Sequence, residues 1–429
     1  MEIALPFIVL VGLLLLGVPI AFGLAGAGTL GIFLVTGDWK NMMNTVGMAP
    51  YLTCSEYVLT TIPMFILMAY FSSWGGLARD LYTAMQNWLS NIRGGLGIAT
   101  VFACGIFGAM SGASTASASA MSKIAMPEMR RFGYSDTLAT GAIGVGSVLD
   151  ILIPPSIAMV VYGISTDTSI GKLLIAGVFP GVLLGIFLIG CILVWVTVNP
   201  SSAPKVMRVS WSERFRSLLA IWPSLLIVIF VLVALYTGMA TPTEVGAVGA
   251  AASGVVGVAM GRLSKADILN ALVDTLVTTT MILFIIVGAM IFGHFVTLSQ
   301  IPQRIVGTIM SLNLNRWIVL WLVIGTYFAI SMFMDELPLM LIIIPIVFPL
   351  ITSIGFDPIW FGVMTMMMVG MGLVFPPVGM IAFVVSSTTK VDLMTVYRGT
   401  SILMIAIILT TILLCLFPQI ALWLPTKMG

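Results

Sequence analysis

Long apolar segments alternate with short polar ones along the whole chain. The apolar segments lie at residues 3–36, 54–74, 94–126, 137–164, 170–198, 218–237, 240–261, 270–298, 316–349, 359–387 and 399–424. A helix needs about 20 mostly apolar residues to cross a bilayer, and most of these segments reach that length. The pattern therefore predicts an all-α polytopic membrane protein, with its first apolar segment retained as a membrane segment rather than removed as a signal peptide.

Two of the longest segments are expected to be re-entrant helical hairpins. Residues 94–126 are too many for one crossing and too few for two crossings plus a loop, and residues 316–349 form the second candidate. The middle of the first segment, residues 111–119, is small and polar. Non-helical backbone survives at that depth only where it is buried in protein or lines a cavity. The first tip is therefore a predicted binding place for an ion or a solute.

Composition and charge support a membrane protein and exclude several classes. The chain is 60% hydrophobic and 8% charged, whereas soluble domains carry roughly 25% charged residues. Its net charge of +2 comes from dispersed Lys and Arg without a basic tract, so no nucleic-acid partner is expected. The four cysteines lie singly, as in a packed core rather than a metal site or disulfide framework. They are Cys54, Cys104, Cys191 and Cys415.

The two halves of the chain resemble each other at a fixed offset. Pro154-Pro155 and Pro376-Pro377 are the only Pro-Pro pairs, and they lie 222 residues apart. Amphipathic segments at residues 77–92 and 301–312 precede the two hairpins and are expected to lie in the membrane interface. This repetition predicts a first repeat at residues 1–200, a connecting loop at 201–217 and a second repeat at 218–429.

The charges predict that the two repeats have opposite orientations. Residues 205–216 form the most basic loop, so the positive-inside rule places that loop in the cytoplasm. Arg130-Arg131 follows the first hairpin, whereas Thr352-Ser353 stands at the matching place in the second. Inverted repeats hold substrate and ion sites near the midplane, where helices are discontinuous. Because each Pro-Pro pair interrupts helical hydrogen bonding, residues 144–155 and 370–377 are expected to be unwound or kinked.

Three separated motifs then resemble one known family. The run at residues 240–250, ATPTEVGAVGA, the break LIPPSI at 152–157 and the break FPPVG at 375–379 are similar to the large membrane subunit of tripartite ATP-independent periplasmic (TRAP) transporters. The resemblance runs from the first helix to the last. It implies a sodium-driven elevator-type importer of organic anions in a bacterial inner membrane, which works with a small membrane subunit and a periplasmic solute-binding protein.

The resemblance also implies where sodium binds, namely where each hairpin tip meets a broken helix. Two sodium sites are expected. The candidate sodium ligands are Ser111, Gly112, Ser114, Gly144, Gly146, Asp150, Asp335, Gly370, Gly372 and Pro376. The candidate substrate-binding residues are Ser114, Thr115, Ser156 and Glu336. The residues alone give Asp335 particular weight, because a carboxylate at the bilayer centre costs about 2.5 to 3.5 kcal/mol on the insertion scale.

Other readings of the same residues stay open. Ser and Thr in membrane helices also bond to neighbouring backbone or pack at helix crossings, and Asp150 could serve a helix end instead of an ion. A stand-alone sodium-coupled dicarboxylate symporter with the same hairpins is the alternative transporter. An intramembrane protease would need a base near Ser111; His294 is the sole histidine and no second motif supports that pairing, so no enzyme is expected. The identity of the anion is not encoded in any motif.

Overall fold

The computed structural model describes residues 4–204, 209–312 and 314–428, and every regular element in those ranges is a helix. The elements before the connecting segment are α1 (Ala4–Leu15), α2 (Ile20–Thr36), α3 (Trp39–Cys54), η1 (Tyr57–Thr60), α4 (Thr61–Trp74), α5 (Leu77–Leu89), α6 (Gly95–Ser111), α7 (Ser114–Arg131), α8 (Asp136–Gly146), α9 (Leu149–Leu152), α10 (Ile157–Thr166), α11 (Ile170–Ala176), α12 (Val178–Val198) and η2 (Pro200–Ser202).

The elements after it are α13 (Trp211–Thr237), α14 (Pro242–Ala259), α15 (Lys265–Leu298), α16 (Ile301–Ser311), α17 (Arg316–Ser331), α18 (Glu336–Ser353), α19 (Pro358–Leu373), α20 (Met380–Thr389), α21 (Leu393–Leu416), α22 (Gln419–Leu422) and η3 (Pro425–Lys427). Within the described residues, seven helical segments are long and apolar enough to cross a membrane. The bent pair of α8–α9 and α10, which turns by 40° at its break, makes an eighth if it is one span. The chain is therefore a multi-pass membrane protein.

Local sequence signals explain many of these helix ends. Ser210, Thr241 and Ser264 each cap a helix, and the acidic residue three positions later bonds back to the cap in all three cases. Such capping boxes satisfy backbone donors that the first turn leaves unpaired. In α14 that acidic residue is Glu244, so the carboxylate of the family-like motif at residues 240–250 serves the helix start.

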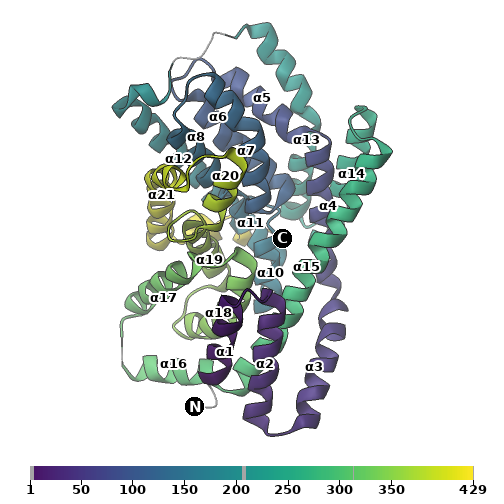
Figure 1. Ribbon diagram of the computed structural model, residues 1–429, viewed down its shortest axis with the longest axis vertical. Coiled ribbons are helices and arrows are strands. Elements are labelled where there is room, and N and C mark those ends of the chain that lie inside the picture. The colour runs from purple at the N-terminus through teal and green to yellow at the C-terminus, as the bar shows by residue number, and fades with distance from the viewer. Residues whose placement is uncertain (1–3, 205–208, 313, 429) are drawn as a thin grey trace.

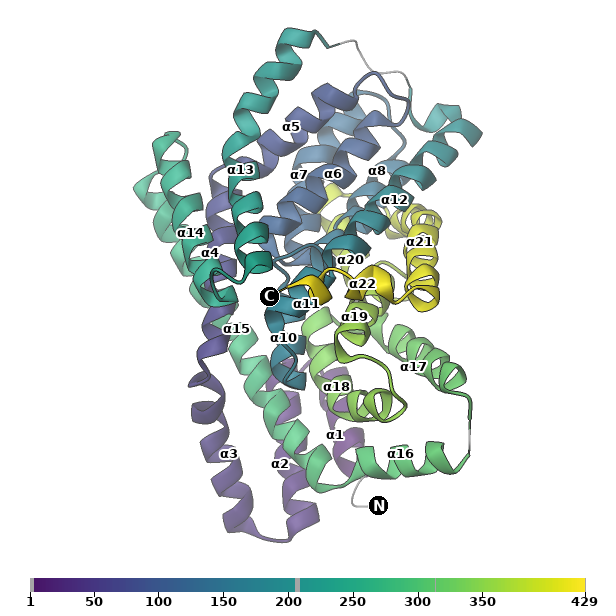
Figure 2. The same ribbon diagram turned by 180° about the vertical axis from the view of Figure 1, so that it is seen from behind.

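The helices form two groups (Figure 1). The long helix α15 packs along α2 and α4, and α14 packs on α4, which gives a layer that runs the length of the molecule. The paired arms α6–α7 and α17–α18 lie beside this layer together with α8 to α12 and α19 to α21 (Figure 2). Each pair of arms is joined by a short turn, at residues 112–113 and 332–335.

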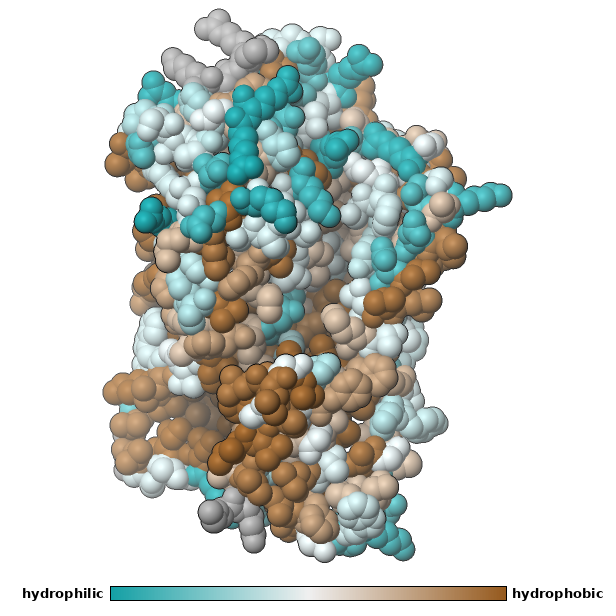
Figure 3. Space-filling model, viewed as in Figure 1, coloured by the Kyte–Doolittle hydropathy of each residue, from teal (hydrophilic) through white to brown (hydrophobic). Residues whose placement is uncertain are grey.

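Surface polarity follows the long axis of the molecule. On the face in Figure 3, hydrophilic residues gather near the upper end and hydrophobic residues gather across the lower half. The same end of the molecule holds the start of α13 and the turn between α5 and α6 (Figure 1). Exposed large apolar side chains are frequent on α13 and α15, among them Trp222, Ile229, Leu276 and Phe284. A bilayer, rather than water, suits such surfaces.

Several predicted boundaries were wrong. Residues 3–36 are two helices, because Gly17 has φ of 78° and Pro19 precedes α2. The connecting loop at 201–217 is shorter than predicted, since α13 begins at Trp211; residues 205–208 lie outside the described residues. The predicted unwinding is also narrower. Helix α8 continues through Gly146 and α19 through Leu373. The helix is interrupted at residues 147–148 and 153–156 in the first half and at 374–379 in the second.

Candidate functional site

The two hairpin tips are built alike. Helix α6 ends at Ser111, Gly112 turns the chain with φ of 63°, and α7 begins at Ser114. In the second hairpin α17 ends at Ser331 and α18 begins at Glu336. The N-cap residues of α7 and α18 make no side-chain capping bond. Both tips therefore present uncapped helix N-termini, whose backbone donors and dipoles attract negative groups.

The tips touch each other through one buried hydrogen bond. The Ser114 hydroxyl donates to Glu336 Oε2 at 2.9 Å. Ser114 is fully buried and Glu336 is 6% exposed. The two residues are the first of their helices and lie 222 positions apart, the same offset as the Pro-Pro pairs. This hydrogen bond sets the distance between the two tips.

Each tip is also bonded to the broken segment of its own half. The Ile157 N–H donates to the Gly112 carbonyl at 3.2 Å, and the Gly379 N–H donates to the Met332 carbonyl at 3.0 Å. The side chain of Ser156 caps α10 by accepting from Met159 N at 3.3 Å. Tip and break thus form one unit in each half.

A cavity of about 150 Å³ lies where both tips face the long layer. The first tip contributes Ser111, Ala113 and Thr115, and the second contributes Asp335 and Glu336. The opposite wall comes from α4 and α15. On that wall Tyr70 Oη and Thr278 Oγ1 are 2.9 Å apart. Sequence reasoning missed Tyr70 and Thr278: they are polar residues within apolar spans, and helix packing alone decides that they face the tips.

Asp150 is buried beside the first tip. It is fully buried in α9, and the Ser111 hydroxyl donates to its Oδ2 at 3.4 Å. Among the described residues no partner bonds to Asp150 Oδ1 or to the hydroxyl of Ser117, which is also fully buried. Leaving such groups without a partner is costly. A small cation with oxygen ligands would satisfy both.

The structure gathers only part of the predicted site. Ser111, Gly112, Ser114, Thr115, Ser156, Asp150, Asp335 and Glu336 lie at the tips or on the segments bonded to them. The predicted glycines Gly144 and Gly370 lie inside continuous helices, and Gly146 is the last residue of α8. Gly372 is needed for packing, because a Cβ there would overlap the Ser331 side chain and backbone. This close approach brings α19 against the end of α17.

Pro376 lies apart from the cavity between the tips. It lines a wider hollow of about 690 Å³ together with Arg398, Asn199 and Tyr397. Tyr397 Oη donates to the carbonyls of Pro377 and Val378 at 2.9 and 2.7 Å, so α21 holds this break in place. The sequence places no arginine in a break or tip, yet folding brings Arg398 beside the second break.

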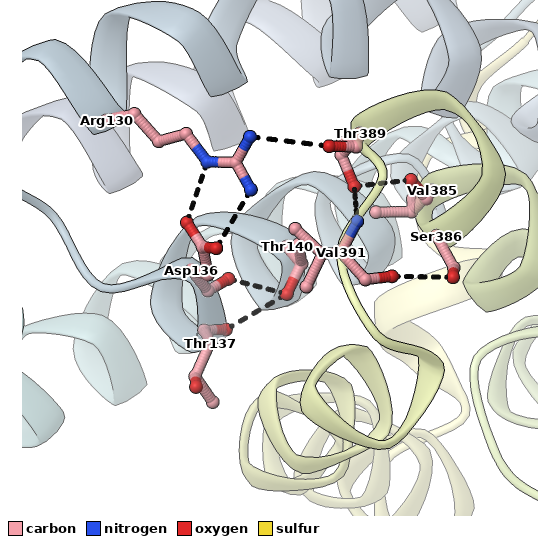
Figure 4. Close-up of polar contacts among 8 residues, drawn as sticks. All are labelled: Arg130, Asp136, Thr137, Thr140, Val385, Ser386, Thr389 and Val391. Carbon is pink, nitrogen blue, oxygen red and sulfur yellow. Dashed lines mark hydrogen bonds and ion pairs between the residues drawn. The ribbon is translucent and has the colours of Figure 1, made fainter.

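Arg130 links the first hairpin to the second half of the chain (Figure 4). Its guanidinium donates two hydrogen bonds of 2.9 Å to Asp136 at the start of α8. A third hydrogen bond, 3.4 Å long, reaches the carbonyl of Thr389, the last residue of α20. An arginine at a helix C-terminus also suits the helix dipole. We call Arg130, Asp136 and Thr389 the clasp.

Helical hairpins that meet inside a polytopic helical protein, each bonded to a proline-broken helix, define a membrane-transporter architecture. The family model for the "Tripartite ATP-independent periplasmic transporter, DctM component" matches residues 7–420. The chain is 36% identical over 411 residues to the C4-dicarboxylate TRAP transporter large permease protein DctM of Pseudomonas aeruginosa, covering 95% of this chain and 94% of the relative. It is 33% identical over 420 residues to the ectoine TRAP transporter large permease protein TeaC of Halomonas elongata, covering 97% of each.

The fold also has a solved counterpart. The YdaH transporter of Alcanivorax borkumensis superimposes with a TM-score of 0.64 at 13% identity, covering 91% of this chain and 90% of the other. The chain therefore belongs to the DctM family, the large permease component of TRAP transporters. It is a permease and not an enzyme. His294, the candidate base of the protease alternative, is exposed on α15, whereas Ser111 is buried.

Proposed function

We propose that the chain is the large subunit of a sodium-driven importer of a small organic anion in a bacterial inner membrane. A periplasmic solute-binding protein delivers the anion, and a small membrane subunit completes the permease. The meeting of the two hairpin tips around the cavity, through Ser114 and Glu336, carries this proposal. The relatives are named for C4-dicarboxylate and ectoine, which supports organic acids as the class of solute.

The polar groups beside the tips favour sodium as the coupling ion. Hydroxyls, carbonyls and a carboxylate are the oxygen ligands that sodium sites in broken-helix transporters use. The first site contains Ser111, Gly112, Ser117 and Asp150, where the unpartnered oxygens lie. The second site lies at the second tip, where Asp335 Oδ1 is buried without a hydrogen-bond partner among the described residues.

Helix positions favour two inverted repeats that move as an elevator. Helices α7 and α18 each have 18 residues and begin 222 positions apart, and α8 and α19 also begin 222 positions apart. The layer of α2, α4, α14 and α15 would be the fixed part. The hairpins and broken helices would carry the solute past it, since midplane sites of inverted repeats change access through movement of one bundle against the other.

Reconstitution tests this function. Proteoliposomes would contain the chain and its small partner, and the binding protein would be added outside with labelled succinate or ectoine. We expect accumulation that needs an inward sodium gradient and the binding protein, without ATP. Equal accumulation from a proton gradient without sodium would contradict sodium coupling. Sodium-driven uptake without the binding protein would instead support the stand-alone symporter.

A further inference from the structure

The cavity between the tips contains acidic side chains without a basic counterpart. Asp335 and Glu336 line it, and no Lys, Arg or His is among its lining residues in the described chain. Within the described residues, the one hydrogen bond to the Glu336 carboxylate is that from Ser114 to Oε2, and Asp335 Oδ1 has none. Buried carboxylates need a positive group or further donors nearby. The cavity walls provide neither in full.

The helix N-termini at the tips offset part of this charge. Helix α7 begins at Ser114 and α18 at Glu336, so both positive dipole ends point to the tips. Each end is equivalent to roughly half a positive charge, which suffices to hold one carboxylate of a solute. A solute with only anionic groups would still place a second negative charge against Asp335 and Glu336, and like charges brought together oppose binding.

The remaining walls suit a compact cationic group. Tyr70 and Phe107 line the same cavity, and aromatic ring faces attract ammonium groups. The cavity volume of about 150 Å³ equals that of about five water molecules at roughly 30 Å³ each. The cavity therefore has room for a small solute.

We propose that the transported organic acid is a zwitterion. Glu336 binds its ammonium or amidinium group, Tyr70 and Phe107 pack beside that group, and its carboxylate faces the N-termini of α7 and α18. This inference rests on the proposed transport function and adds the substrate class. A sodium ion could supply the same positive charge to Glu336, so the experiment must separate a cationic solute from sodium.

Thermal unfolding of the purified full-length chain in nanodiscs, measured with each ligand, distinguishes binding of a cationic solute from binding of sodium. The unfolding midpoint would be titrated with ectoine and glycine betaine as zwitterions and with succinate as a dianion, at fixed ionic strength, with sodium or potassium. A ligand that binds the native state raises the midpoint in proportion to its saturation. The variants are Glu336→Gln, Glu336→Asp and the control Glu56→Gln, which removes an exposed carboxylate at the start of η1.

We expect a zwitterion to stabilise the wild-type chain at concentrations at least about tenfold below those of succinate, which corresponds to about 1.4 kcal/mol. Glu336→Gln should erase that preference and retain the response to sodium. Glu56→Gln should keep both. Glu336→Asp should restore the preference only in part, because its shorter side chain retains the carboxylate but moves it away from Ser114. The charge-retaining Glu336→Asp variant shows whether a loss in Glu336→Gln comes from charge rather than from misfolding.

Binding of succinate at least as tight as that of both zwitterions would overturn the zwitterion proposal. A preference that survives in Glu336→Gln would overturn it as well. So would loss of the sodium response in Glu336→Gln, because Glu336 would then be a sodium ligand. Stabilisation by sodium without any response to the solutes would also reject the zwitterion and leave the sodium-driven function standing. Absence of the sodium response in the wild-type chain would instead count against the proposed function.

Discussion

The contact between the hairpin tips can be weighed with a double-mutant cycle. Ser114→Ala removes the donor that bonds to Glu336 Oε2 at 2.9 Å. Both residues are buried. Removing one partner of a buried hydrogen bond costs about 1 to 3 kcal/mol. We therefore expect Ser114→Ala to lower the free energy of unfolding by that amount, a factor of roughly 5 to 150 in the unfolding equilibrium.

The same substitution should cost little once the carboxylate is gone. Glu336→Met replaces it by an apolar side chain of similar length, and Ser114→Ala in that background should cost less than about 0.5 kcal/mol, the limit of additivity for independent sites. Ser117→Ala is the matched control. Its hydroxyl lies one turn along α7, is buried and has no partner among the described residues, so its removal should be neutral or stabilising.

Unfolding in mixed micelles, followed by tryptophan fluorescence in sodium-free buffer, measures all the variants without a contribution from bound ions. Additive costs of Ser114→Ala and Glu336→Met, within about 0.5 kcal/mol, would refute the inference that this bond joins the tips. A cost for Ser117→Ala equal to that of Ser114→Ala would refute it as well, because the effect would then be general to the helix.

Three further outcomes follow from the structure. Asp335→Asn keeps the size and removes a carboxylate of the cavity, so uptake in proteoliposomes should fall severely with normal membrane insertion; near-normal uptake would return Asp335 to a structural role. Arg130→Gln should slow uptake several-fold through loss of the clasp, but it should change the free energy of unfolding by less than about 1 kcal/mol, as for other exposed ion pairs. The control Arg131→Gln, at an arginine 72% exposed, should change neither the uptake rate nor the free energy of unfolding. In a cysteine-free chain, Ser212→Cys should react with an impermeant thiol reagent only from the cytoplasm and Ser353→Cys only from the periplasm, and equal labelling from outside would contradict inverted repeats.

The hairpins were predictable because their signals are local. Gly112 and the polar residues after it interrupt an apolar run, and the Pro-Pro pairs end helices wherever they occur. Local signals also hid one boundary. The apolar residues around Gly17 and Pro19 read as a single span, although a Gly and a Pro two residues apart divide α1 from α2. Hydropathy measures apolar length and does not register such a break.

The site was less predictable because it depends on packing. No local sequence signal indicates that Ser114 contacts Glu336, or that Tyr70 and Thr278 of the other layer face them. Gly144 and Gly370 show the converse. The Pro-Pro pairs predicted unwinding at these positions, yet both glycines are buried within helices, because tertiary packing outweighs a propensity cost of about 1 kcal/mol per glycine.

The central claim is that ion and solute bind where the two tips meet. Hydrogen–deuterium exchange of the purified chain in sodium and in potassium tests this most directly, because it locates the effect of the ion along the backbone. We expect sodium to slow exchange at residues 108–118, 148–157 and 330–340, with no change in α13 or α14. Exchange that is the same in sodium and potassium at all three segments, or protection confined to other helices, would contradict it.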